Sequence, residues 1–180
     1  DPATALIEVT PRNGEALIRH DDVCALIERE GATIATVLLP GVQYLTGQRF
    51  DIVSIAALAS QQGCRVGVDL AHAIGNVPLA LHDSHIDFAV WCSYKYLNGG
   101  PGAIGGAFVH ERHARSFDLP RLAGWWGHNH ATRIAMPEDF SPLPGADGWQ
   151  VSNPPLLAMT PLSPSLAPFA RAGMMRLREK

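Results

Sequence analysis

Four short apolar runs, separated by helix-like segments, constrain the fold of this 180-residue chain more than any other feature of its sequence. The runs cover residues 33–39, 64–70, 87–93 and 104–110, and each contains Val beside other apolar residues. Nearly continuous runs of this length are typical of buried strands, because a sheet covered on both faces alternates little between apolar and polar positions. The sequence therefore predicts an α/β fold with a mostly parallel sheet flanked by helices.

The segments outside these runs carry helix signals. Apolar residues recur at three-to-four spacing behind Asp21 and Asp22, which could cap a helix, and Asp51 could cap another that Gly63 ends. From Asp118 onward, Pro, Gly, His and Trp in irregular stretches predict surface loops, the usual place of functional sites. We expect helical segments at residues 22–30, 51–62, 78–82 and 165–179.

Composition excludes several classes of protein. A hydrophobic fraction of 47% allows a sizeable core and excludes a disordered chain, while a net charge of -3 with scattered Lys and Arg argues against a nucleic-acid surface. No run of about 20 apolar residues predicts a membrane span, and no signal peptide is recognisable. We expect a soluble cytoplasmic protein that binds neither nucleic acid nor membranes, with reduced thiols at Cys24, Cys64 and Cys92.

Asp69 and Lys95 follow neighbouring predicted strands, which places both at the carboxyl edge of the sheet, where open α/β folds bind ligands. A single lysine after a strand is more often an ordinary surface residue. Lys95, however, lies between two tyrosines in WCSYKYLNGG, after an apolar strand and before a glycine loop. Such a setting can favour the neutral, nucleophilic amine, and a lysine in that state can form a Schiff base.

Asp69 has two interpretations. Its carboxylate could cap a short helix that begins just after the strand. It could instead face a pyridine nitrogen and keep that nitrogen protonated, the arrangement that makes pyridoxal phosphate an electron sink. His72 would lie one helical turn further on and could contact the same cofactor.

Other chemistries fit the sequence less well. Residues 100–105 match GxGxxG, but the dinucleotide fingerprint must open a helix, and a strand is predicted to follow here. Histidine pairs such as His110 with His113 and His128 with His130 lack converging carboxylates or thiolates, so we expect no metal site. A serine hydrolase is disfavoured because the chain has no GxSxG motif.

The chain resembles the kynureninases, members of the aspartate aminotransferase-like, fold type I pyridoxal phosphate enzymes, in four blocks: VGVDLAHAIGNVPLALHD, DFAVWCSYKYLNGGPGAIGGAFVHERH, LAGWWGH and SNPP. The resemblance extends from about Ile34 to Pro155, and the CSYKYLN block is highly specific. It implies that residues 1–160 are a central portion of the large cofactor-binding domain and that residues 161–180 begin the connection to a small C-terminal domain.

The resemblance also implies an activity. Kynureninases hydrolyse L-kynurenine or 3-hydroxykynurenine to anthranilate or 3-hydroxyanthranilate and L-alanine, in tryptophan catabolism or NAD biosynthesis, and they are homodimers. By this resemblance Lys95 would hold pyridoxal phosphate and shuttle protons, while Asp69 would pair with the pyridinium nitrogen, beside His72. Tyr94 would send its phenol to the cofactor phosphate and help to deliver protons.

Further roles fall on the loops. Trp125 and Asn153 would contact the cofactor, and His128, Ser152 and Asn153 would line the pocket for the aromatic substrate. In the dimers of this family, some such contacts come from the neighbouring subunit. Trp126 and Trp149 are interpreted more simply, as core or interface aromatic residues.

The chain departs from the family mainly in extent. It begins at Asp1 without an initiator Met, and the N-terminal cofactor contacts and the C-terminal arginine that clamps the substrate carboxylate fall outside it; Pro40 stands where some relatives have Ser. We expect a central fragment that binds cofactor weakly and turns over poorly. The alternatives are another fold type I enzyme, such as a cysteine desulfurase or an aminotransferase, or an inactive module that serves association.

Overall fold

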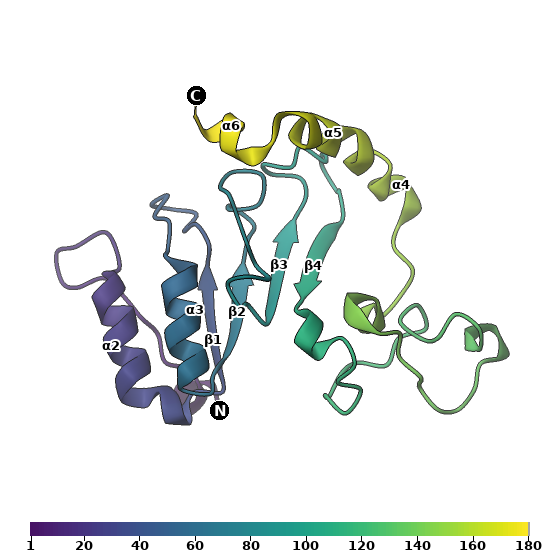
Figure 1. Cartoon of the computed structure of the whole chain (residues 1–180), viewed down its shortest axis with the longest axis horizontal. Coiled ribbons are helices and arrows are strands. Elements are labelled where there is room, and N and C mark those ends of the chain that lie inside the picture. Colours follow the sequence, from purple (N-terminus) through teal and green to yellow (C-terminus); the bar gives the residue numbers. More distant parts are fainter. Residues whose placement is uncertain (180) are drawn as a thin grey trace.

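A four-stranded sheet organises the computed structural model, which describes residues 1–179 (Figure 1). β1, β2 and β3 pair in parallel and β4 runs antiparallel to β3, in the order β1-β2-β3-β4. All four predicted strands and the mostly parallel sheet are confirmed. The first strand begins later than predicted, because residues 31–33 form a 3-10 helix. The strands are β1 (Thr36–Pro40), β2 (Arg65–Asp69), β3 (Phe88–Cys92) and β4 (Gly105–Val109).

Two helices, α2 (His20–Glu30) and α3 (Ile52–Gln61), confirm the first two predicted helices. Asp51 caps α3 as expected, because its side chain accepts a hydrogen bond from the backbone N–H of Ser54. The predicted cap of α2 is wrong. This helix begins at His20, its N-cap Arg19 makes no side-chain capping bond, and Asp21 and Asp22 lie in the first turn. There the two carboxylates interact favourably with the positive end of the helix dipole and stabilise the helix.

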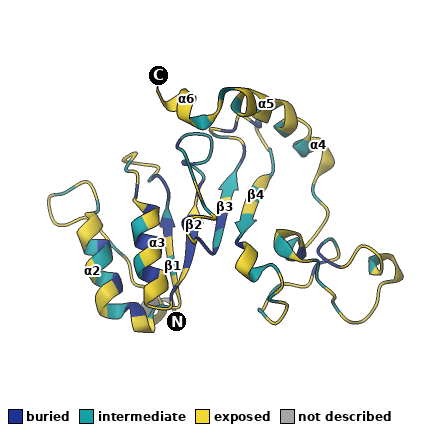
Figure 2. Cartoon of the chain, in the orientation of Figure 1, coloured by how far each residue is buried: buried dark blue, intermediate teal, exposed yellow. Residues whose placement is uncertain are grey.

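The core lies between these helices and one face of the sheet (Figures 1 and 2). Ile55 and Ala56 of α3 and Val66 and Val68 of β2 are fully buried there. Residues two apart on a strand share a face, so Asp69 projects from the opposite face of β2. On that opposite face, within the part of the chain that the structure describes, Leu38 is 65% exposed and Val90 is 46% exposed.

The remaining segments are irregular or short. The helix predicted at residues 78–82 is wrong: this stretch forms turns and irregular backbone, in which isolated hydrogen bonds such as Ser84 N–H to Ala80 O replace a helical ladder. The loops expected after Asp118 are confirmed, with 3-10 turns at η3 (Arg133–Ala135) and η4 (Gly145–Trp149). Further short helices are α1 (Pro2–Ala5), η2 (Glu111–His113) and α4 (Leu156–Met159).

The predicted terminal helix is two helices, α5 (Leu162–Ala172) and α6 (Met174–Arg178), separated at Gly173, whose φ of 76° interrupts the helical backbone. In Figure 1, α4 to α6 pass the end of the sheet at which β3 terminates. The last residue of the predicted 161–180 connection lies outside the described residues. Within residues 1–179 no helix combines the length and the apolarity that a membrane crossing requires.

Candidate functional site

The carboxyl edge of the sheet brings together the side chains that the sequence places there. Asp69 is the last residue of β2, and Lys95 follows the end of the neighbouring parallel strand β3 by three residues. The loop that carries Lys95 is closed by a backbone hydrogen bond of 2.8 Å from Gly99 N–H to Ser93 O, and Leu97 is buried beneath it. Lys95 itself is half-buried. The strand ends therefore hold the amine at the edge where open α/β sheets bind ligands.

His72 is the direct neighbour of Lys95. The distance between Lys95 Nζ and His72 Nε2 is 2.9 Å, so the two groups can share a proton. His72 lies in a succession of turns after β2, rather than in the expected helix, and its carbonyl accepts a hydrogen bond from the Asn76 side chain. Gly75, with φ of 73°, lets this segment approach the lysine loop, because a Cβ there would lie 3.0 Å from Tyr96 O. Backbone packing thus fixes the lysine–histidine pair.

The Asp69 carboxylate is exposed and only partly used. Its Oδ1 accepts a hydrogen bond of 2.8 Å from the backbone N–H of Ala71, which makes it the cap of a turn. Its other oxygen has no hydrogen-bond partner within the part of the chain that is described. The capping interpretation therefore holds for one oxygen, and the second remains free to meet a cationic group. Its pairing with a pyridinium nitrogen stays a prediction.

Tyr94 lies beside the lysine. Its ring centroid is 5.9 Å from Lys95 Nζ, and the residue is 52% exposed. The phenol makes no hydrogen bond with the residues that the structure describes. It is available to a ligand, and its contact with a cofactor phosphate stays a prediction.

Trp125 and His128, which were predicted to act from the loops, do not contact Lys95 or its neighbours. Trp125 is 48% exposed, and its indole N–H donates to Arg133 O at 3.2 Å. His128 is buried, with Nε2 2.9 Å from Thr132 Oγ1 and Nδ1 accepting from the backbone N–H of Ser141. Both lie in the irregular segment beside the end at which β4 terminates, which is the opposite edge of the sheet (Figure 1).

Ser152 and Asn153 are exposed, and the Ser152 hydroxyl donates to Asn153 Oδ1 at 3.4 Å. Across residues 1–179, no hydrogen bond or ring contact connects Trp125, His128, Ser152 or Asn153 with Lys95. Within one chain, therefore, the predicted substrate-side residues remain apart from the lysine.

Three further residues at the carboxyl edge were missed by the sequence analysis. The Tyr44 and Tyr96 rings lie 6.3 Å and 6.2 Å from the His72 ring. The Ser93 hydroxyl is buried two residues before Lys95 and has no hydrogen-bond partner among the described residues. Tyr44 could have been found, because its loop follows β1 and must reach the same edge as the loops after β2 and β3.

The opposite edge carries a different cluster, which includes the histidine pair of HERH. Asp87 Oδ1 lies 2.5 Å from His113 Nε2 and 2.8 Å from Arg112 Nη2, and Oδ2 accepts from the backbone N–H of Val66. Burial by itself would raise the pKa of Asp87, but the hydrogen bonds from His113 and Val66 outweigh it and hold the pKa below its ordinary value. No group of three His, Cys, Asp or Glu side chains in residues 1–179 is arranged to hold a metal ion.

The glycine loop after Lys95 leads into β4 and not into a helix, which confirms the rejection of a dinucleotide fingerprint. Gly100 and Gly102 both have positive φ, 84° and 76°, a conformation that glycine adopts without steric cost. The glycines therefore serve the turn between the lysine and β4. Cys24, Cys64 and Cys92 are free thiols, as expected, although only Cys64 is buried.

Known proteins extend this picture. Residues 2–125 match the aminotransferase class-V family. Over all 180 residues the chain is 56% identical to a kynureninase of Koribacter versatilis (strain Ellin345) and 58% identical to one of Xanthomonas oryzae pv. oryzae (strain PXO99A). It spans 42% of the length of each of these curated relatives.

Among solved structures, an apo cysteine desulfurase from Thermococcus onnurineus NA1 superposes with a TM-score of 0.70 at 17% identity. The alignment covers 93% of this chain and 39% of the desulfurase. At that identity the similarity concerns the fold, and it supports the predicted α/β architecture.

Proposed function

Because this chain belongs to the aminotransferase class-V family, whose members depend on pyridoxal phosphate, we propose that it forms the lysine-bearing part of the active site of a kynureninase. The reaction is the hydrolysis of L-kynurenine, or of 3-hydroxy-L-kynurenine, to anthranilate or 3-hydroxyanthranilate and L-alanine. One observation carries the proposal. All 180 residues of this chain align with a kynureninase at 56% identity, and the Lys95 amine lies 2.9 Å from His72 at the carboxyl edge of the sheet, where β2 ends with Asp69.

The carboxyl edge fits the cofactor chemically. It offers a half-buried primary amine at Lys95, a carboxylate oxygen of Asp69 without a partner, and the unsatisfied hydroxyl of Ser93, all within the described residues. Lys95 would hold pyridoxal phosphate covalently, Asp69 would face its ring nitrogen, and His72 and Tyr94 would contact it. When bound, the cofactor supplies an electron sink for charge that develops on the substrate.

The residues themselves would divide the proton chemistry. Lys95, once displaced by the substrate amine, would take and return protons, with His72 Nε2 close enough to accept or donate one. Asp69 would stabilise a positive charge at the ring nitrogen, since a carboxylate favours the protonated form of a neighbouring base. The free phenol of Tyr94 could donate to phosphate or to the reacting substrate.

The substrate side needs a second copy of the chain in this proposal. Trp125, His128, Ser152 and Asn153 lie apart from Lys95 of their own chain, and Trp125 and Asn153 are exposed. We propose that they act in the site of a cytoplasmic homodimer. We further propose that residues 1–160 belong to a large cofactor-binding domain and that residues 161–180 begin the connection to a smaller one.

Labelling tests the cofactor site sharply, because the sequence has only two lysines, Lys95 and Lys180. The chain is incubated with pyridoxal phosphate, reduced with borohydride and mapped by peptide mass spectrometry. We expect modification at Lys95, retained in Lys180→Arg and lost in Lys95→Ala together with the visible absorbance. Modification confined to Lys180 would contradict the assignment.

The activity is tested in a chimera in which these 180 residues replace the matching segment of the Xanthomonas oryzae relative. We expect release of anthranilate from L-kynurenine, followed by fluorescence, and none from the same chimera carrying Lys95→Ala. A folded, cofactor-loaded chimera that produces no anthranilate would refute the kynureninase assignment while leaving the cofactor site in place.

A further inference from the structure

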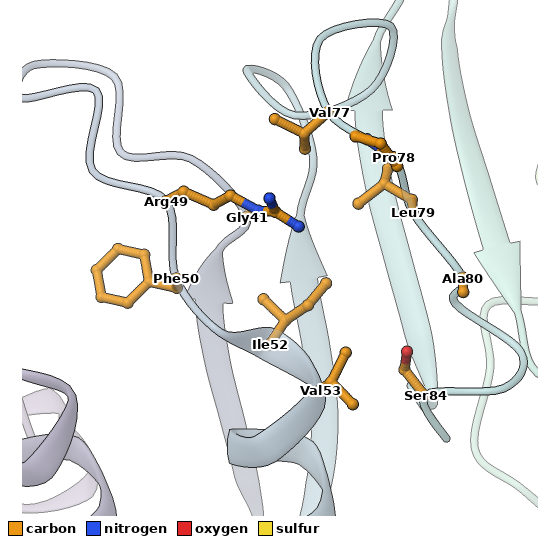
Figure 3. A pocket seen from close by; sticks show the side chains of 10 residues that line it. All are labelled: Gly41, Arg49, Phe50, Ile52, Val53, Val77, Pro78, Leu79, Ala80 and Ser84. Atoms are coloured by element: carbon orange, nitrogen blue, oxygen red, sulfur yellow. The ribbon is translucent and has the colours of Figure 1, made fainter. Parts of the chain in front are cut away.

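A cavity of about 190 Å3 lies beside α3, and its lining residue Gly41 donates a backbone hydrogen bond of 2.8 Å to the carbonyl of Asp69. It opens between the start of α3 and the irregular segment at residues 77–84 (Figure 3). Its apolar wall includes Ile52, Val53, Val77 and Leu79. None of the residues assigned to the cofactor or the substrate lines it.

Two polar side chains lie along this apolar wall without partners. In Figure 3 the Arg49 guanidinium extends from the loop before α3 over Ile52 toward the 77–79 segment, and Ser84 directs its hydroxyl toward Val53. Ser84 is only 6% exposed. Neither the guanidinium nor the hydroxyl makes a hydrogen bond or ion pair with any residue that the structure describes. Arg49 is an exposed residue, so its guanidinium can pair with an anionic ligand, and the Ser84 hydroxyl can contact the same ligand because both residues line the cavity.

The shape and charge of the cavity limit the ligand. A cavity of roughly 150 Å3 lined by apolar side chains accommodates benzene, so a volume of about 190 Å3 suits a ligand of about one ring. The planar guanidinium of Arg49 matches a carboxylate, which it can bind through two parallel hydrogen bonds. Ser84 can donate to, or accept from, a polar substituent at the other end of such a ligand.

The neighbouring carboxylate of Asp51 disfavours ligands that carry more than one negative charge. Arg49 and Asp51 both line an adjoining recess of about 210 Å3 beside the start of α3. Hydrogen bonds from Ser54 hold the pKa of Asp51 below its ordinary value, so Asp51 is an anion near neutral pH. It would repel the second charge of a dianion such as phosphate more than the single charge of a carboxylate.

We propose that this cavity is a second binding site, specific for a small aromatic monocarboxylate whose carboxylate pairs with Arg49 and whose ring packs on Ile52, Val77 and Leu79. The proposed site shares no lining residue with the cofactor site at Lys95. It requires no change in the fold, because the wall and both polar groups are already in place.

The test is a titration of the full 180-residue chain, with 13C-labelled methyl groups, with benzoate as the probe. We expect the methyl signals of Ile52, Val53, Val77 and Leu79 to shift and to saturate together. Arg49→Gln should weaken benzoate binding about tenfold, because a charge-assisted hydrogen bond is lost. The matched control Arg115→Gln removes another exposed arginine and should leave the affinity unchanged.

Two further probes separate charge from simple apolar binding. Benzamide, which has the same ring without the charge, should bind the native chain more weakly than benzoate and should bind Arg49→Gln as it binds the native chain. Inorganic phosphate should not shift these methyl signals. Ser84→Ala should weaken benzoate about threefold. The proposal is overturned if benzoate leaves the four methyl groups unshifted, or if Arg49→Gln, with an unchanged circular dichroism spectrum, binds benzoate as tightly as the native chain.

Discussion

Asp69 combines a structural and a chemical task in one carboxylate. Oδ1 holds the turn after β2 through the Ala71 N–H, while the second oxygen is free at the edge that carries Lys95. An asparagine could keep the first contact through its amide oxygen, but it could not balance a positive charge on a ligand. Substitution at this residue can therefore separate folding from cofactor binding.

We predict that Asp69→Asn leaves the fold intact and lowers the affinity for pyridoxal phosphate about tenfold, the effect of losing one charge-assisted hydrogen bond. An absorbance titration measures the affinity, and circular dichroism checks the fold. Asp83→Asn, which removes an exposed carboxylate elsewhere, is the control and should bind normally. Equal affinities for the two variants would show that Asp69 has only its structural task.

His110 makes stability depend on pH. Its Nδ1 accepts a hydrogen bond from the backbone N–H of Arg112, a contact that protonation at this nitrogen would remove. Burial and then the charge of Arg112 lower the pKa of His110. The hydrogen bond with the His82 carbonyl raises it by less, and the charges of the stacked His82 and of Glu111 have smaller, opposite effects. The unfolded chain therefore takes up this proton at a higher pH than the folded chain, and the contribution of His110 to stability is lost as pH falls below about 6.5.

We predict that the free energy of unfolding falls between pH 7 and pH 5 and falls less in His110→Gln. His82 works in the opposite direction: hydrogen bonds with Asp83 and Glu111 raise its pKa, so its contribution is lost as pH rises. The useful quantity is therefore the difference between native and variant, measured by urea unfolding at each pH. His130→Gln, at an exposed position, should follow the native curve. A difference that is constant with pH would rule out titration of His110 as the cause.

The four strands and the residues at the carboxyl edge of the sheet could be predicted from the sequence, whereas the positions of the loops could not. The apolar runs located all four strands, and parallel order alone put Asp69 and Lys95 at one edge. The turns around residue 82 are tied to a distant segment, because His110 Nε2 lies 3.2 Å from the His82 carbonyl oxygen, and the loop of Trp125 is held by a hydrogen bond from Gly127 N–H to Gln150 O. No local sequence pattern predicts such contacts. The pairing of Lys95 with His72 was likewise expected only as proximity, and its 2.9 Å distance comes from packing around Gly75.

Asp87 connects three elements at the edge of the sheet opposite Lys95, where the parallel strands begin, which we call the amino edge. It precedes β3, accepts from the Val66 amide of β2, and pairs with Arg112 and His113 of η2. Removing a buried carboxylate leaves these partners unpaired, although Arg112 remains partly solvated. One side chain thus joins the start of β3, the start of β2 and the turn after β4.

We predict that Asp87→Ala destabilises the chain by about 3 kcal/mol, toward the lower end for breaking a buried ion pair because the arginine can be rehydrated. Urea unfolding at pH 7 measures the loss. Asp83→Ala, whose histidine pair is exposed, should cost less than about 1 kcal/mol. A loss below 1 kcal/mol in Asp87→Ala would mean that the cluster does not hold the elements together.

In the whole molecule, the two edges and the two faces of the sheet have different characters. The amino edge is closed by the pairs around Asp87, whereas the carboxyl edge keeps free groups at Asp69 and Tyr94. One face packs against α2 and α3 (Figure 2), whereas on the other face Leu38 and Val90 are exposed within residues 1–179. Binding chemistry and unpaired apolar surface therefore lie on the parts of the sheet that the helices leave open.

The open face should make the chain associate. The register aligns Leu38 with Gly67 and Gly67 with Phe88, so the apolar surface continues across three strands, and contiguous exposed apolar surface favours contacts between molecules. We predict concentration-dependent association that the double variant Leu38→Thr, Val90→Thr reduces, since threonine keeps the strand preference and removes apolar area. Sedimentation velocity over a range of concentrations measures it. Leu45→Thr, at a still more exposed position, is the control and should associate like the native chain, because Leu45 lies in the loop after β1 and not on the open face of the sheet. If the loop variant reduced association as much as the sheet variant, the open face would not be the surface through which the molecules meet.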